Sequence, residues 1–188
     1  MVAMILCAIL MIAVEIVDQS MGGLLDYHLA IIPQSDIQQL IVGIIGAPFS
    51  HGDTNHLAGN LVAYFPLSFL LVLKGEDFLR LWLLLSLFAG IGTWWLGYPG
   101  SAHIGASGVI FGQWSYLLAG GIFHRDLNSI LSAGLCGVWL GKMFVSLINV
   151  SPGISWEGHA SGVVGGIVVA IFFKEFVCSE KSKVSYSR

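Results

Sequence analysis

The chain has 188 residues, of which 56% are hydrophobic and only 10% are charged, with a formal net charge of −3. Soluble domains carry about 25% charged residues, so this composition excludes an ordinary soluble protein. The 24 glycines among so many apolar residues are typical of a polytopic helical membrane protein whose helices pack through small residues. The sequence has no basic cluster of the kind that binds nucleic acid, and Cys7, Cys136 and Cys178 lack the spacing of metal ligands. We therefore expect no nucleic-acid partner, no metal and no cofactor.

Six apolar segments follow one another, and all but the first two are separated by short breaks that are rich in glycine, proline or charge. They cover approximately residues 1–17, 55–73, 78–98, 105–123, 128–149 and 157–177. Since about 20 apolar residues span a bilayer as a helix, we predict an all-α polytopic membrane protein with six transmembrane helices. One membrane domain is expected at 1–177, followed by a charged cytoplasmic tail at 178–188.

The first segment is interpreted as a transmembrane helix rather than a signal peptide. It lacks a basic start and a small-residue cleavage site, and Glu15 and Asp18 follow its apolar run. The long connection after it, at about 18–54, contains the apolar stretch 40–45 (LIVGII). We expect this loop to lie partly in the membrane as short helices.

The positive charges indicate the orientation of the chain. Seven of them lie near the breaks after the second and fourth segments or near the C-terminus: Lys74, Arg80, Arg125, Lys174, Lys181, Lys183 and Arg188. By the positive-inside rule, both termini are expected to be cytoplasmic in a multi-pass protein of a prokaryotic cytoplasmic membrane. The eighth cation, Lys142, is expected to extend to the outer surface or, alternatively, to line a cavity.

Four polar residues fall at one depth in this topology. Ser107 and His159 lie in the first turns of the fourth and sixth helices, and His56 and Asn60 lie in the first two turns of the second. All three helices start at the outer face. Because an ionisable residue at membrane depth is costly, its presence there points to function.

Small residues mark the faces on which these helices are expected to meet. Gly108 and Gly112 form such a face on the fourth helix, and Gly158, Gly162 and Gly166 form one on the sixth. These faces allow close backbone approach, which a serine–histidine hydrogen bond of about 2.6–3.2 Å requires. The alternative, that the glycines serve packing alone, is compatible with this role.

The same residues predict the parts of a hydrolytic site. Ser107 is the candidate nucleophile and His159 its general base, forming a dyad because no acidic residue lies beside the histidine at membrane depth. The Ser107 backbone N–H, the Asn60 amide and the His56 ring are candidate donors to an oxyanion. Phe111, one turn beyond Ser107, is expected to pack against the His159 ring.

Each of these residues also has a structural interpretation. A serine in a membrane helix commonly packs or bonds back to its own helix, and a buried histidine or asparagine commonly joins two helices. His103 is a rival base, although it precedes the fourth helix and shares a loop with Ser101. His51 is expected to lie at the membrane interface and to tether the first loop.

Several motifs together resemble the rhomboid family of intramembrane serine proteases. They are residues 51–60 (HGDTNHLAGN), 105–112 (GASGVIFG) and 155–162 (SWEGHASG) with Gly166, and 47–49 (APF) adds to them. A GxSG motif alone has little specificity. Three motifs in the family's order, on its helices and on one side of the membrane, identify the family strongly.

The resemblance implies a six-helix fold with a water-filled cavity open to the outer side. It implies cleavage of single-span membrane proteins in the lipid bilayer, near the outer end of their transmembrane segments. By position, Ser107 and His159 correspond to the family's nucleophile and base. His56, Asn60 and Gly105 correspond to its oxyanion site.

Substrate access and loop anchoring are the remaining implications of this resemblance. The region at about 135–156 corresponds to the family's gate and cap. The first loop has no Trp-Arg pair, a motif that braces it in many members.

Because a helix keeps its carbonyls in hydrogen bonds, the substrate has to unwind locally, which favours weak helix formers near the scissile bond. The small residues around Ser107 predict that the substrate has a small side chain at P1, the residue before the scissile bond.

Two other functions are compatible with parts of the sequence. One is a catalytically inactive relative that binds membrane proteins, against which the presence of both Ser107 and His159 argues. The other is a small transporter with a polar vestibule. Transporters commonly contain internal repeats, and the sequence shows none. Transport would survive Ser107→Ala, whereas proteolysis would not.

Overall fold

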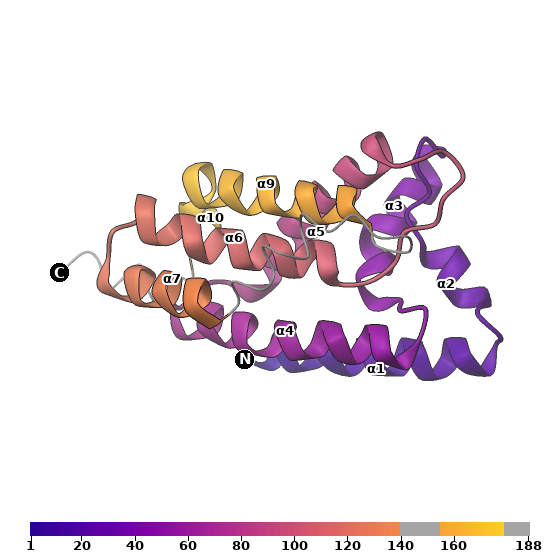
Figure 1. Cartoon of the computed structure of the whole chain (residues 1–188), viewed down its shortest axis with the longest axis horizontal. Coiled ribbons are helices and arrows are strands. Elements are labelled where there is room, and N and C mark those ends of the chain that lie inside the picture. The colour runs from indigo at the N-terminus through magenta and orange to yellow at the C-terminus, as the bar shows by residue number, and fades with distance from the viewer. Residues whose placement is uncertain (140–154, 179–188) are drawn as a thin grey trace.

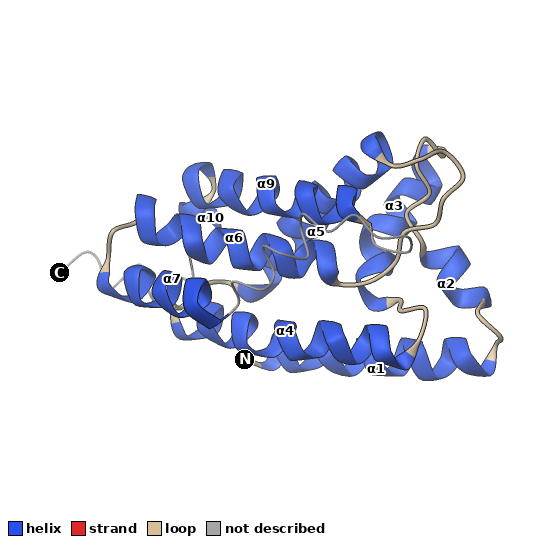
Figure 2. Ribbon diagram, in the orientation of Figure 1, coloured by secondary structure: helices blue, strands red, loops and turns tan. Residues whose placement is uncertain are grey.

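A computed structural model describes residues 1–139 and 155–178, which form helices joined by short loops (Figures 1 and 2). In chain order the helices are α1 (Val2–Ser20), α2 (Leu24–Leu29), α3 (Ile37–Gly46), the 3-10 turn η1 (Ala47–Phe49), α4 (Thr54–Leu73), α5 (Phe78–Leu96), α6 (Ser107–Phe123), α7 (Leu127–Trp139), α9 (Trp156–Phe172) and α10 (Lys174–Val177). Within these two ranges only isolated β-bridges occur and no strand forms. The all-helical class that the sequence predicts is confirmed.

Six of these helices coincide with the six predicted segments. α1, α4 and α5 are each long and apolar enough to cross a membrane, while α7 and α9 are shorter apolar helices. The sixth predicted segment differs, because its helix stops at Phe172 and α10 follows as a separate short helix. These helices define an integral membrane protein, and the number of spans stays a prediction. The end of the fifth segment and Lys142 lie outside the described residues.

The first loop contains the short helices α2 and α3 and the turn η1. Trp94 of α5 makes two hydrogen bonds to neighbouring residues of this loop. Its Nε1 donates to Ser35 O at 3.0 Å, and its carbonyl accepts from Gln34 N at 3.1 Å. α3 exposes Ile37 and Ile45 on its outer face. Trp94 therefore anchors a loop that has no Trp-Arg pair, and the membrane embedding of this loop stays a prediction.

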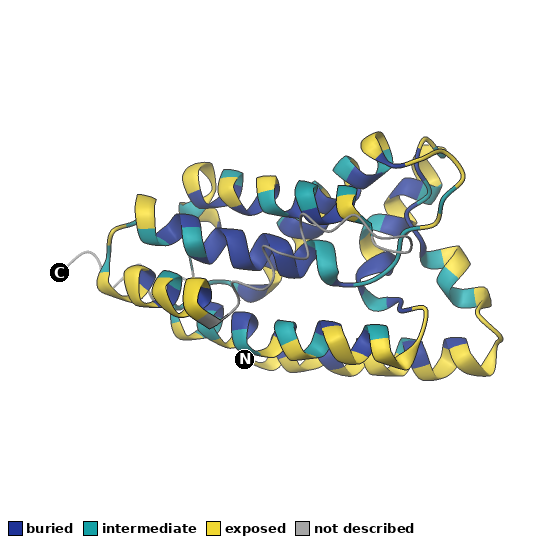
Figure 3. Ribbon diagram, viewed as in Figure 1, coloured by how far each residue is buried: buried dark blue, intermediate teal, exposed yellow. Residues whose placement is uncertain are grey.

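α6 is the central helix, and most of its length is buried (Figure 3). It packs closely against α9, and also contacts α4, α5 and α7. Its core side chains include Gln113, which is 1% exposed and accepts a hydrogen bond from Ser68 of α4 at 3.3 Å. The helix that begins at Ser107 is therefore held by packing on several sides.

Glycines allow α6 and α9 to approach so closely. A Cβ at Gly108 would lie 3.2 Å from Gly158 O, and one at Gly112 would lie 3.2 Å from Gly162 O. A Cβ at Gly162 would overlap the Gly108 backbone. The helices therefore meet on the two small-residue faces that the sequence predicts.

We expect Gly166→Ala to destabilise the fold by about 1–3 kcal/mol, because overpacking a tight core carries a cost of this size. A Cβ there would overlap Gly112 O and the Tyr116 backbone nitrogen, and backbone atoms have little freedom to move. Thermal unfolding in one detergent measures the change. Gly134→Ala is the control, because Gly134 is exposed on α7 and no described atom lies within 4 Å of its Cβ position. Equal melting temperatures for the two variants would contradict the packing argument.

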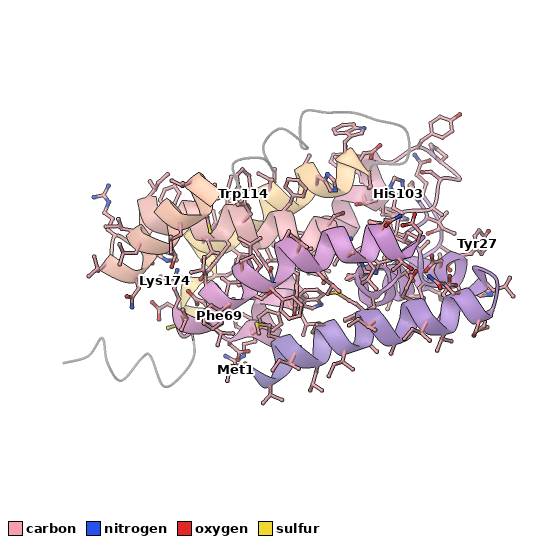
Figure 4. The ribbon with its side chains drawn as sticks, turned by 60° about the horizontal axis from the view of Figure 1, so that its bottom comes forward. Met1, Tyr27, Phe69, His103, Trp114 and Lys174 are labelled. Atoms are coloured by element: carbon pink, nitrogen blue, oxygen red, sulfur yellow. The ribbon has the colours of Figure 1, made fainter. Side chains whose placement is uncertain are left out.

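Five of the side chains labelled in Figure 4 lie toward the two ends of the molecule. Met1, Phe69 and Lys174 lie toward one end, and Tyr27 and His103 lie toward the other. α4, α6 and α9 begin near the His103 end, which groups their first turns. The orientation of these ends in the membrane stays a prediction, and three of its supporting cations lie in the tail beyond the described residues.

A buried ion pair lies at the end of the molecule that carries Lys174. Lys74 Nζ lies 3.2 Å from Glu76 Oε1, with side chains 5% and 8% exposed, and it also faces the Tyr116 ring. Burial raises the pKa of Glu76, and the Lys74 charge opposes this rise. Asp77 N donates to Val177 O at 2.6 Å, which joins the α4–α5 turn to α10.

Candidate active site

Ser107 is the first residue of α6. The turn before it depends on Gly105, whose φ of +108° lies in a region that other residues rarely adopt. A Cβ on Gly105 would also lie 2.8 Å from the His56 ring and 3.5 Å from Asn60 Nδ2. Glycine at this position therefore permits both the turn and the close approach of α4. As the first residue of a helix, Ser107 has a backbone N–H without an intrahelical acceptor.

His159 lies in the first turn of α9, with its Nε2 2.9 Å from Ser107 Oγ. This is the distance at which a hydroxyl donates to a neutral imidazole. The ring of Phe111 stacks on that of His159, with a centroid distance of 4.3 Å and an interplanar angle of 29°. His159 is 7% exposed, and its Nδ1 has no hydrogen-bond partner among the described residues. The structure thus joins Ser107 and His159 as a pair, with no acid bonded to the histidine in the described chain.

His56 and Asn60 face the same place from α4. Asp53 caps this helix by accepting from His56 N at 2.8 Å, which fixes its first turn. Asn60 is 7% exposed, and its Nδ2 is a buried donor without a partner in the described chain. The Gly105 N–H instead donates to Ala47 O at 2.8 Å. Two side-chain donors are therefore available here, and an oxyanion role for Gly105 itself would require its N–H to leave Ala47.

A cavity of about 840 Å³ lies beside these groups. Ser107, His159, His56 and Asn60 all line it, together with exposed polar residues such as Asn55. The cavity is large enough for water and an unwound stretch of peptide. Most of the region predicted as gate and cap, 135–156, lies outside the described residues.

His51 is fully buried within the protein, and its depth in the membrane stays a prediction. Its Nδ1 lies 3.3 Å from Phe49 O, and its Nε2 accepts from Ala106 N at 3.5 Å, directly before Ser107. Its ring also meets the His56 ring edge to face at 5.1 Å. Burial lowers the pKa of His51 to about 4, with a smaller contribution from His56. His51 is therefore a neutral residue that supports the turn before Ser107.

Two acidic residues near the C-terminal end of α1, Glu15 and Asp18, are buried, and Asp26 in the first turn of α2 is half-buried. Glu15 and Asp18 are 3% and 5% exposed, and Asp18 accepts from Asp26 N at 2.9 Å. Gln19 Nε2 lies 2.7 Å from Glu15 Oε1 and 2.9 Å from Thr54 Oγ1, which links α1 to the start of α4. Burial raises the pKa of Asp26 to about 6. The spacing of Glu15, Asp18 and Gln19 on one helical face was the available signal.

His103, the rival base, does not bond to Ser107. Its Nε2 lies 2.7 Å from Ser101 Oγ, and its Nδ1 lies 2.7 Å from Ser155 Oγ. Both ring nitrogens are therefore occupied by other hydroxyl groups. Among the described residues, no group of three or more histidine, cysteine or acidic side chains is arranged to hold a metal ion.

The fold and the site define a helical membrane protein with a partly buried serine–histidine pair beside a polar cavity. A family model described as the Rhomboid domain matches residues 38–176. The chain belongs to the rhomboid family.

Relatives include proteins of bacteria and of a virus. The chain is 35% identical over 176 residues to the uncharacterized protein Rv1337 of Mycobacterium tuberculosis, covering 86% of this chain and 70% of the relative. It is 34% identical over 171 residues to the uncharacterized protein ML1171 of Mycobacterium leprae, covering 86% and 66%. It is 30% identical over 141 residues to the putative rhomboid protein L523 of Acanthamoeba polyphaga mimivirus, covering 71% and 75%.

Proposed function

We propose that this chain is an intramembrane serine endopeptidase that cleaves single-span membrane proteins near the outer membrane face. The observation that carries the proposal is the 2.9 Å contact between Ser107 Oγ and His159 Nε2. The contact lies in the first turns of two apolar helices and beside a cavity lined by further hydrogen-bond donors. A pairing that only joined helices would not need such a cavity or unpartnered donors.

Ser107 and His159 carry the proton transfers in the proposed reaction. Ser107 Oγ attacks the scissile carbonyl while its proton passes to His159 Nε2. The intermediate collapses, the peptide C–N bond breaks, and the leaving amine takes that proton. Water then attacks the serine ester and gives a proton to Nε2, which returns it to Ser107 as the new carboxylic acid leaves. Phe111 holds the imidazole in the plane that these steps require, because it stacks on the ring.

The negative oxygen of each intermediate is stabilised from α4 and α6. Asn60 Nδ2 is a buried donor whose hydrogen bond is not made to any described residue, so it is ready for an oxygen that appears only during the reaction. His56 and the Ser107 backbone N–H are the other proposed donors. Gly105 contributes by leaving room for the His56 ring.

The proposed substrate enters from lipid and meets water in the cavity. A transmembrane helix exposes a peptide bond only where it unwinds, so glycine and other weak helix formers are expected near the cleavage site. The proposed reaction uses groups of this chain and water, without a cofactor or metal. We place the site on the outer side of a prokaryotic cytoplasmic membrane, with both chain termini in the cytoplasm, on the basis of the charge distribution.

The second candidate is an inactive rhomboid-like protein that binds membrane proteins. It keeps the fold but makes no use of the Ser107–His159 contact or of the Asn60 donor. The mycobacterial relatives are uncharacterized and so do not distinguish this candidate from the protease. The labelling experiment below distinguishes the two. A small transporter is the less favoured third candidate.

A fluorophosphonate probe tests the proposal without a known substrate. We expect the detergent-purified wild type to be labelled at Ser107, and both Ser107→Ala and His159→Ala to lose labelling while melting at the wild-type temperature. Mass spectrometry of the labelled peptide identifies the serine. A folded wild type that does not react would reject an activated serine and favour the inactive binder.

A further inference from the structure

A second serine–histidine contact lies immediately upstream of the candidate dyad. His103 and Ser155 precede Ser107 and His159 by four positions each, and each pair joins residues 52 apart. The upstream contact therefore connects the same two stretches of chain as the dyad does. The residue types are exchanged, with the histidine on the α6 side and the serine on the α9 side.

The directions of the hydrogen bonds around His103 follow from the donors available. Ser101 Oγ lies 2.6 Å from Tyr98 O and 2.7 Å from His103 Nε2. A carbonyl only accepts, so the single Ser101 hydroxyl proton goes to Tyr98. His103 Nε2–H then donates to Ser101, and its Nδ1 accepts from the Ser155 hydroxyl at 2.7 Å. Burial lowers the pKa of His103 below its ordinary value and thereby favours the neutral ring, while the Glu157 charge opposes part of this shift.

The backbone of His103 is held as firmly as its ring. Its N–H donates to Ile31 O at 3.0 Å, and its carbonyl accepts from Ile31 N at 2.9 Å. The ring also packs against Gly97, where an added Cβ would lie 3.1 Å from Nε2. His103 therefore gives Ser155 a fixed acceptor that belongs to the loop leading into Ser107.

Ser155 is the N-cap residue of α9, and it does not cap the helix in the usual way. A serine at this position commonly accepts a hydrogen bond from the backbone N–H groups of the first turn. Here its side chain makes no capping bond, and its hydroxyl is bonded to His103 instead. Its carbonyl still accepts from His159 N at 3.1 Å. The position of Ser155 thus determines where the first turn of α9 carries His159.

We propose that His103 is a positioning residue that acts through the Ser155 hydroxyl to set the separation of Ser107 and His159. The proposal rests on the proposed protease function and adds a residue outside the reacting groups. His103 is tied along the chain to Ser107, and Ser155 is tied along the chain to His159. Their hydrogen bond closes a loop of contacts that fixes the two halves of the dyad against each other.

A matched pair of substitutions at Ser155 tests this proposal. Threonine keeps the hydroxyl, and valine has nearly the same shape without it. We expect Ser155→Thr to keep most of the fluorophosphonate labelling rate. We expect Ser155→Val to slow labelling and kcat by about 10–100-fold, since misplacement of about 1 Å costs up to this much, with a smaller change in KM. His103→Ala should slow the reaction similarly, and adding Ser155→Val to it should cause little further loss.

Ser115→Ala is the control for a merely structural bond between the same helices. Ser115 Oγ of α6 donates to Val163 O of α9 at 2.9 Å, deeper in the bundle than the dyad. Its loss is expected to lower the melting temperature and leave the labelling rate unchanged. If Ser155→Val and Ser155→Thr are labelled at the same rate, whether that rate is high or low, the proposal is overturned.

Nitrogen-15 NMR of the His159 ring separates this inference from the function on which it rests. The Nε2 chemical shift reports its hydrogen bond to Ser107 whether or not the protein cleaves a substrate. We expect the wild-type shift in Ser155→Thr and a changed shift in Ser155→Val. A wild type that is not labelled would reject the protease function alone, whereas an unchanged Nε2 shift in Ser155→Val would reject the positioning role of His103.

Discussion

Ser107→Ala is expected to reduce cleavage of a single-span membrane substrate by about 10⁶-fold, the loss found when a serine protease loses its nucleophile. The hydroxyl is the atom that forms the covalent bond, and no other described hydroxyl lies against His159 Nε2. The removed oxygen is small and the helix start is held by Gly105 and His51, so the fold should persist. The measurement is cleavage of a glycine-containing transmembrane substrate in proteoliposomes, with melting temperature recorded in parallel.

Two further variants make this result specific. Ser68→Ala removes a buried helix–helix serine that bonds to Gln113 at 3.3 Å outside the site, and cleavage should continue. His159→Ala should lose about as much activity as Ser107→Ala, and the double variant should lose no more, since the two act as one unit. Undiminished cleavage by Ser107→Ala would reject Ser107 as the nucleophile and with it the assigned dyad.

Asn60→Ala is expected to lower kcat by about 10²–10³-fold with a smaller effect on KM, the range for loss of one oxyanion donor. Asn60 is 7% exposed, and its Nδ2 has no partner in the described residues. A buried donor that lacks a hydrogen bond destabilises the resting protein. The substitution should therefore leave the melting temperature unchanged or raise it. Steady-state kinetics on the same substrate, together with thermal unfolding, measure both effects.

Asn55→Ala is the matched control for this prediction. Asn55 is on the same helix and lines the same cavity, but it is exposed to solvent. Little change in kcat is expected from its loss. If Asn60 instead served as a link between helices, Asn60→Ala would lower the melting temperature, and kcat would fall only as far as the folded fraction does. That outcome would contradict an oxyanion role.

The grouping of the candidate site could be predicted because it depends on depth in the membrane. Ser107 and His159 each follow a break and each start an apolar segment. The topology therefore places them in one layer, and the glycine faces predict that their helices meet. The structure adds the 2.9 Å contact and the Phe111 stacking. The catalytic roles themselves stay predictions until the variants are measured.

Several features could not be predicted, because they depend on how loops fold over the helix ends. The full burial of His51 and its contact with the Ala106 N–H depend on how the first loop packs against the start of α6. The bond between Trp94 and Ser35 brings together residues 59 apart. Neither hydrophobic periodicity nor a sequence motif indicates such a contact, because an irregular loop has no regularly repeating face.

The amino-acid sequence by itself determined the all-helical membrane class, the rhomboid family and the grouping of the candidate site residues at one end of the helices. These follow from apolar length, glycine spacing and the position of polar residues along each helix. Only the tertiary structure decided which partners these residues have within that layer. In the structure His103 is bonded to Ser155 rather than to Ser107, and the Gly105 N–H donates to Ala47 O. Depth follows from chain position, whereas lateral contacts depend on the rotation of each helix and on the packing of the loops around it.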